Sequence, residues 1–214
     1  MKTSCLLLIF ITALLKANGQ SDSAISKPAN IRLAYNSSII YPGAAIGIDF
    51  PVQDILFTKH WNNGDSMSIL RQRFISGSIG YYHHRGFHDN IYILPEWVMR
   101  RTPGKTWFTE FNFGLGYSRT FLGGTTYNVA ENGVVSIIHA AGYSYAMAAA
   151  GFGVGYNLSY RNTPFALYTR FNLLIMFPYN STVYPRPTLE IGMIYDPPHF
   201  MERKLRHIHK IKHV

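Results

Sequence analysis

Cysteine, charge and long apolar runs are all scarce in this sequence. Its 214 residues include one cysteine, Cys5, and only 14% are charged, whereas 15% are aromatic. A disordered chain has many charges and few aromatics, so this composition excludes one. After Leu15, no apolar run approaches the roughly 20 residues that a membrane-spanning helix needs, which excludes a helical membrane protein.

The N-terminal segment has the pattern of a secretory signal peptide. Lys2 supplies a positive charge, Leu6–Leu15 supplies an apolar run, and Ala17 and Gly19 place small residues at the two key positions of a cleavage site. We therefore expect cleavage near Gly19, with Gln20 as the first mature residue. The mature chain would lack cysteine, which excludes disulfides and thiol chemistry.

Positive charge is concentrated near the C-terminus. Residues 20–214 contain 18 Lys and Arg against 11 Asp and Glu, a net charge of +7, and Met201–Val214 carries +4 of it. The remainder is close to neutral, whereas a nucleic-acid-binding protein shows a basic face within its fold. We therefore expect no nucleic-acid partner.

Alternation of bulky and small residues predicts β-strands. In Trp107–Leu122, the odd positions are mostly aromatic or aliphatic, whereas the even positions from Glu110 onward are small or polar. Ile31–Tyr35 is short but could supply an eighth strand. Similar alternation predicts strands over Gly43–Phe50, Ile69–Tyr82, Ile91–Arg101, Gly151–Tyr160, Phe165–Phe177 and Thr188–Tyr195.

The chemistry of the two faces predicts an antiparallel transmembrane β-barrel. A face of glycine, serine and asparagine makes a poor hydrophobic core but suits a small polar lumen, which leaves the bulky face to meet lipid. A closed barrel also leaves no unpaired edge in hydrocarbon. We predict eight strands. Ten are an alternative if Asp54–His60 or the 123–142 segment pairs within the wall, and a soluble β-sandwich is the other alternative.

The connections differ in length. Thr102–Lys105 and Arg161–Pro164 are short and rich in turn formers, whereas 83–90, 123–142 and 177–187 are longer. Short periplasmic turns and longer outer loops are typical of outer-membrane barrels. We expect a signal peptide at 1–19, a lead segment at 20–29, the barrel at 30–196 and a basic tail at 197–214, with Asn132-Gly133 closing a hairpin within the long loop.

Several segments resemble uncharacterised outer-membrane β-barrel proteins of Gram-negative bacteria. They are Tyr41–Gly43, Tyr81–Phe87, Gly114–Phe121 and Phe177–Asn180, within a resemblance that covers most of residues 30–196. It implies a cell-envelope barrel whose partners are outer-membrane lipid and the barrel-assembly machinery, and it brings no catalytic residues. One departure is that Tyr195, the aromatic residue ending the last predicted strand, is followed by 19 more residues.

Inward-facing charges are the first candidate site. Because a buried charge is costly unless it is paired, we expect an ion-pair network that fills the lumen. A gated pore or proton path is the alternative, although eight strands enclose too little space for an open channel. The predicted network consists of Asp49, Glu96, Arg100, Glu110, Arg170 and Glu190.

Metal and catalytic sites have less support. His83, His84 and His88, near Asp89, are the residues that would bind a metal, but no Cys or Glu supports them and solvated histidines are the alternative. Ser136, His139 and Glu131 form the only Ser/His/carboxylate set, without a glycine elbow. We therefore expect no cofactor, no metal and no catalysis.

The sequence thus predicts a small outer-membrane barrel with a structural or loop-mediated binding role and an unknown loop ligand. The alternatives are a narrow channel or transporter, an envelope lipid-modifying enzyme and a soluble ligand-binding β-barrel. The assignment of faces predicts that Phe113→Arg blocks assembly and that Gly114→Ser, on the lumen face, is much milder.

Overall fold

The computed structural model describes residues 29–38, 41–60, 66–158, 163–179, 182–197 and 206–207. The predicted signal peptide at 1–19, nearly all of the lead segment at 20–29 and most of the basic tail lie outside these residues. In the part of the chain that the structure describes, no helix is long and apolar enough to cross a membrane.

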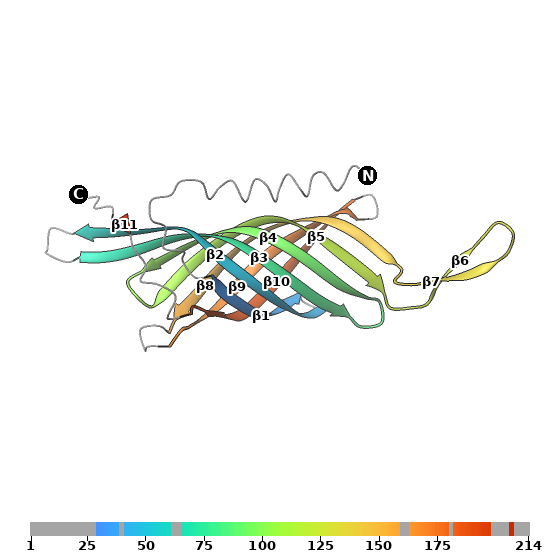
Figure 1. Ribbon diagram of the computed structural model, residues 1–214, viewed down its shortest axis with the longest axis horizontal. Helices are drawn as coiled ribbons and strands as arrows, with labels where there is room; N and C mark the ends of the chain where they lie inside the picture. The colour runs from blue at the N-terminus through green and yellow to red at the C-terminus, as the bar shows by residue number, and fades with distance from the viewer. Residues whose placement is uncertain are drawn as a thin grey trace.

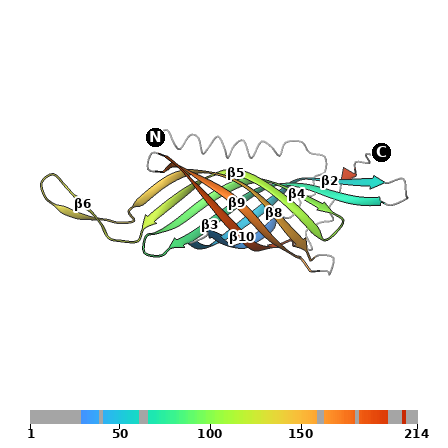
Figure 2. The same ribbon diagram turned by 180° about the vertical axis from the view of Figure 1, so that it is seen from behind.

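Eight antiparallel strands form a closed barrel (Figures 1 and 2). β1 pairs with β10 on one side and with β2 on the other, which closes the ring and confirms the prediction of eight strands. The wall strands are β1 (Asn30–Ser38), β2 (Tyr41–His60), β3 (Ser66–His84), β4 (His88–Pro103), β5 (Trp107–Leu122), β8 (Gly142–Asn157), β9 (Phe165–Tyr179) and β10 (Thr182–Tyr195).

Three short strands lie outside the ring. β6 (Thr126–Val129) and β7 (Val135–Ile138) form a separate hairpin that projects beyond one end of the barrel (Figure 1). β11 (Arg206–His207) pairs in parallel with β2 at Ile55 and Leu56. The alternative of ten wall strands is therefore wrong, because 54–60 continues β2 and the long connection makes its own hairpin.

Two connections are shorter than the sequence predicts. Within 83–90, pairing continues to His84 and His88, so that only residues 85–87 form the turn. Within 177–187, β9 runs to Tyr179 and β10 begins at Thr182. The ladder extends because backbone groups at the rim satisfy each other across strands beyond the part that alternates in sequence.

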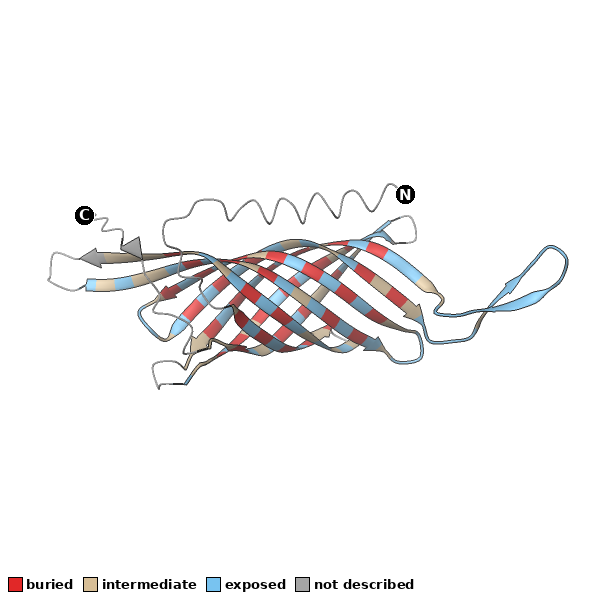
Figure 3. Ribbon diagram, in the orientation of Figure 1, coloured by how far each residue is buried: buried red, intermediate tan, exposed pale blue. Residues whose placement is uncertain are grey.

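Buried and exposed residues alternate along the wall strands (Figure 3). Most large exposed side chains are apolar, whereas the lumen holds buried charges together with two apolar clusters, one around Tyr82 and Met176 and one around Phe108 and Ile194. In β5, Phe113 and Leu115 are 49% and 66% exposed, whereas Glu110 of the same strand is 2% exposed. An apolar exterior around a lumen that buries charges is typical of a transmembrane barrel. The closed ring overturns the β-sandwich alternative.

The even number of strands places both ends of the wall, Asn30 and Tyr195, side by side. That end also carries the turn between β4 and β5. The opposite end, which we call the hairpin end, carries the β6–β7 hairpin and the turn at 85–87 (Figure 1).

Gly114 corrects one expectation from the sequence. A Cβ added at this residue would lie 2.3 Å from the carbonyl oxygen of Pro95 and 2.9 Å from Cγ of Glu96. Small residues on the lumen face are thus required by the close approach of the next strand, and they do not mark spare room. Gly114→Ser is not a mild change.

We predict that Gly114→Ala lowers the free energy of unfolding by about 1–3 kcal/mol through overpacking. Gly77 of β3, which pairs with Pro95 but is exposed on the outer face, is the control, because its added Cβ would meet nothing within 4 Å. Gly77→Ala should change stability by less than about 0.5 kcal/mol. Urea unfolding in detergent micelles measures both, and equal losses would contradict this account of the packing.

Candidate functional site in the barrel lumen

The middle of the lumen holds a cluster of buried charges. Each of its members comes from an inward position of a wall strand, since side chains alternate between lipid and lumen along each strand. We call it the lumen charge cluster, and it comprises Arg32, Asp49, Glu96, Arg100, Glu110, Arg170 and Glu190, all of them buried.

Glu110 is the centre of this cluster. Nη2 of Arg100 lies 2.5 Å from its Oε1, and Nη2 of Arg170 lies 2.8 Å from its Oε2. Nη1 of Arg32 lies 3.5 Å from the same Oε2. One carboxylate therefore holds three guanidinium groups that come from three different strands.

The other carboxyl groups complete the cluster. Nη2 of Arg32 donates to Oδ2 of Asp49 at 2.7 Å, and Nη1 of Arg170 lies 3.5 Å from Oε2 of Glu96. Asn112 donates to Oε1 of Glu96 at 2.6 Å.

Glu190 is held by neutral donors. The hydroxyl of Tyr168 donates to its Oε1, and Nδ2 of Asn172 donates to its Oε2 at 3.1 Å.

The structure brings five of the six predicted lumen charges into direct contact with Arg32 or with each other, and Glu190 lies beside them on β10. Arg32 is a member of the cluster that was not predicted from the sequence. It lies in β1, whose brief alternation of Ile31 and Leu33 around it was the signal that could have placed it inside.

The cluster leaves almost no open space at mid-height. A cavity of about 10 Å³, lined by Arg32, Glu96 and Arg170 among others, adjoins it. That volume is close to the minimum that one water needs. A second cavity, of about 290 Å³, lies toward the end of the barrel that carries Asn30 and Tyr195. It is lined by Gln72, Thr102 and neighbouring side chains.

The three histidines do not converge. Nδ1 of His83 lies 2.7 Å from Oδ1 of Asp89 on the outer surface, where the hydroxyl of Tyr81 donates to the same oxygen at 2.7 Å. His84 instead packs against the rings of Tyr41 and His88, with centroids 4.2 and 5.0 Å away. Among the described residues, no group of three His, Cys, Asp or Glu could hold a metal ion.

The Ser/His/carboxylate set lies on the hairpin. Ser136 is part of β7, opposite Asn128 of β6, and Ser136, His139 and Glu131 are all exposed. An exposed set lacks the buried, oriented carboxylate that activates a serine–histidine pair.

Comparison with known proteins shows weak structural likeness. No protein-family model and no curated protein matches the chain. The N-terminal β-barrel domain of Pseudomonas aeruginosa OprF aligns with a TM-score of 0.41 and 14% identity, over 78% of this chain and 95% of that one. Neisserial surface protein A aligns with a TM-score of 0.42 and 14% identity, over 78% and 94%. At these scores the likeness does not extend to function.

Proposed function

We propose that this protein is a small integral outer-membrane β-barrel with a structural or loop-mediated binding role and no catalytic activity. The observation that carries the proposal is the reversal of faces, with aromatic and aliphatic side chains outside and a charge cluster inside. In water, such a surface would be a very large exposed apolar area. In a bilayer it is the favourable one.

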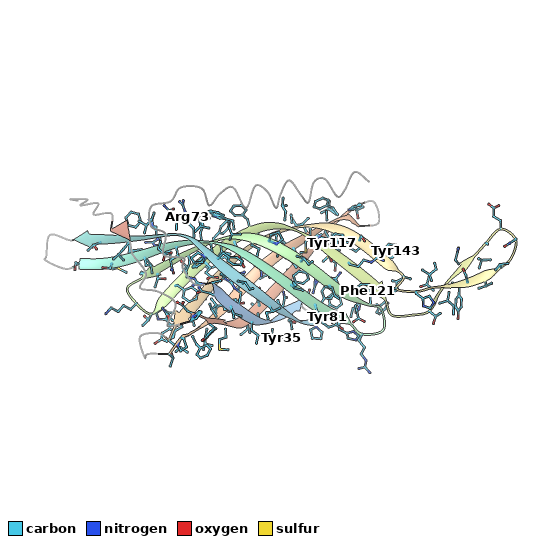
Figure 4. The ribbon with its side chains drawn as sticks, viewed as in Figure 1. Tyr35, Arg73, Tyr81, Tyr117, Phe121 and Tyr143 are labelled. Carbon is cyan, nitrogen blue, oxygen red and sulfur yellow. The ribbon has the colours of Figure 1, made fainter. Side chains whose placement is uncertain are left out.

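The dimensions support a membrane-spanning wall. The wall strands other than β1 contain 14 to 20 residues, more than the roughly 9–11 that cross the hydrocarbon. Exposed tyrosines lie on the half of the barrel nearer to the hairpin end (Figure 4): Tyr35, Tyr81, Tyr117 and Tyr143. At the other end Trp107 packs edge-on against Tyr156, with centroids 4.9 Å apart. Aromatic girdles of this kind mark the two membrane interfaces.

The orientation follows from the predicted export. A signal peptide at 1–19 would deliver the chain to the periplasm, and both wall ends, Asn30 and Tyr195, would stay on that side, followed by the basic tail. The hairpin end then faces outward. The partners proposed are outer-membrane lipid and, during insertion, the barrel-assembly machinery, with the hairpin as the surface for a loop ligand.

The lumen charge cluster disfavours the narrow channel. Arg170 of β9 reaches past β8 to Glu110, Arg32 approaches Glu110 from β1 on the opposite wall, and the cavity beside them is about 10 Å³. A channel would show conductance steps in a planar bilayer. An envelope enzyme would lose activity on a lipid substrate when Ser136 or His139 is replaced.

We expect the protein to be heat-modifiable and to fractionate with the outer membrane. Because a closed barrel keeps its backbone hydrogen bonds in detergent, the unboiled sample should migrate faster on a detergent gel than the boiled one. Gel migration of membrane and periplasmic fractions measures this. A soluble periplasmic protein without a shift would overturn the proposal.

A further inference from the structure

The lumen near the hairpin end contains a buried cation that no described carboxylate neutralises. Arg186 of β10 is 2% exposed, and its Nε and Nη1 have no hydrogen-bond partner. Its guanidinium carbon lies 3.3 Å from the ring centroid of Tyr82 and 5.6 Å from that of Tyr41. The arginines of the lumen charge cluster differ, because each lies within 4.0 Å of at least one carboxylate.

Two other polar groups without a hydrogen-bond partner lie near Arg186, beyond the tyrosine rings that it contacts. Thr188 follows on the same face of β10, is buried, and has a hydroxyl without a hydrogen-bond partner. Nδ1 of His84 is also buried and unpartnered, and its ring packs on Tyr41, which in turn faces Arg186. The cluster therefore combines a guanidinium with a hydroxyl and an imidazole that can each donate a hydrogen bond, and no ion pair with a described carboxylate is formed there.

Two prolines fix the backbone that presents Arg186. Pro185 and Pro187 flank it, and both lie beyond Ser37↔Leu189, the last pair between β10 and β1. Proline has a locked φ angle and no N–H, so it stiffens this stretch without removing a hydrogen bond to β1. Arg186 is thus held in place before any ligand arrives, which lowers the entropy cost of binding.

We propose that this cluster, which we call the Arg186 site, binds an oxyanion of the phosphate type. A buried guanidinium without a counterion is unfavourable, and cation–π contact with Tyr82 offsets only part of that cost. The planar fork of arginine matches the oxygens of phosphate, and hydroxyl and imidazole donors add to it. Because Arg186 is buried, water screens these contacts only weakly.

The phosphate group would come either from a small solute or from a lipid headgroup. The Arg186 site depends on the proposed outer-membrane location in one respect only, which is the side of the membrane from which the ligand enters the barrel. A protein that proved soluble but bound phosphate through Arg186 would contradict the location and keep the site, so the two failures are distinguishable.

Binding is tested on the full chain refolded in phosphate-free maltoside micelles. We expect inorganic phosphate, compared with chloride at equal ionic strength, to raise the temperature at which the fast-migrating gel band is lost. Arg186→Met should bind phosphate at least about tenfold more weakly, the loss of a charge-assisted hydrogen bond. Without phosphate, this variant should be no less stable than the wild type.

Arg73→Met is the matched control. Arg73 is exposed, lies toward the other end of the barrel (Figure 4) and donates to Gln53 at 3.0 Å, so its phosphate response should equal that of the wild type. If Arg186→Met fails to fold, His84→Phe replaces it, because phenylalanine keeps the ring packing and loses Nδ1. This variant should bind phosphate several-fold more weakly.

A parallel titration with short-chain phosphatidylglycerol distinguishes the sources. An Arg186-dependent response to inorganic phosphate assigns a free solute, whereas a response to the lipid alone assigns a headgroup. The proposal is overturned if neither probe gives a response that depends on Arg186 or, where that variant does not fold, on His84.

Discussion

Phe113→Arg is expected to prevent assembly of the barrel. Phe113 lies at the middle of β5, opposite Trp97 on one side and Ala150 on the other, and its side chain is half exposed on the outer face. In a bilayer, an arginine at the midplane of a barrel costs about 2–4 kcal/mol. From this height an arginine side chain is too short to reach either membrane interface, so little of that cost can be recovered.

The measurement is the fraction of protein that gives the fast-migrating band after refolding into lipid vesicles, followed by urea unfolding of whatever folds. Tyr127→Arg is the control, because Tyr127 is also an exposed aromatic residue but lies on β6, beyond the barrel wall. It should refold like the wild type. Equal damage from both substitutions would show that the face carrying Phe113 does not meet lipid.

Period-two alternation predicted the wall where one face is bulky and the other small. Trp107–Leu122 is β5 with the same bounds, because aromatic residues and glycines give maximal contrast there. The first half of β8, from Gly142 to Ala150, escaped prediction because its alanines suit either face.

Irregular strands hid other elements. The prediction for β2 ended at Phe50, whereas the strand continues to His60 through a register shift between Pro51 and Gln53. Such a bulge inserts an extra residue and reverses the alternation, so that Asp54 faces inward as Asp49 does. Because the alternation breaks between Pro51 and Gln53, the sequence pattern alone ends the strand at Phe50.

The site was predictable only in part, for a related reason. Residue identity and alternation indicate that Glu110 and Arg170 point inward, but their 2.8 Å contact depends on the register of β5, β8 and β9, which places the two residues on either side of Gly153. Arg186 was not predicted to lie inside the barrel, for a different reason. Prolines at 185 and 187 are loop signals, since proline is excluded from most strand interiors, and here they occupy the stretch of β10 that extends past β1.

Glu110→Gln is expected to have the largest effect on stability of the lumen substitutions. The amide keeps the shape of the side chain but removes the charge that Arg32, Arg100 and Arg170 share. Removing one partner of a buried ion pair leaves an uncompensated charge and costs about 3–5 kcal/mol. Urea titration of the fast-migrating band in detergent micelles should show the midpoint falling accordingly.

Glu131→Gln, on the exposed hairpin, makes the same chemical change and should leave the midpoint unchanged. A second variant separates charge imbalance from lost packing. Adding Arg100→Met to Glu110→Gln removes one of the three guanidinium groups and should recover part of the stability, because the excess positive charge falls. If the double variant is instead less stable than Glu110→Gln alone by the full cost of Arg100→Met, the two side chains act independently, and the cluster is not the charge-balanced unit that its geometry indicates.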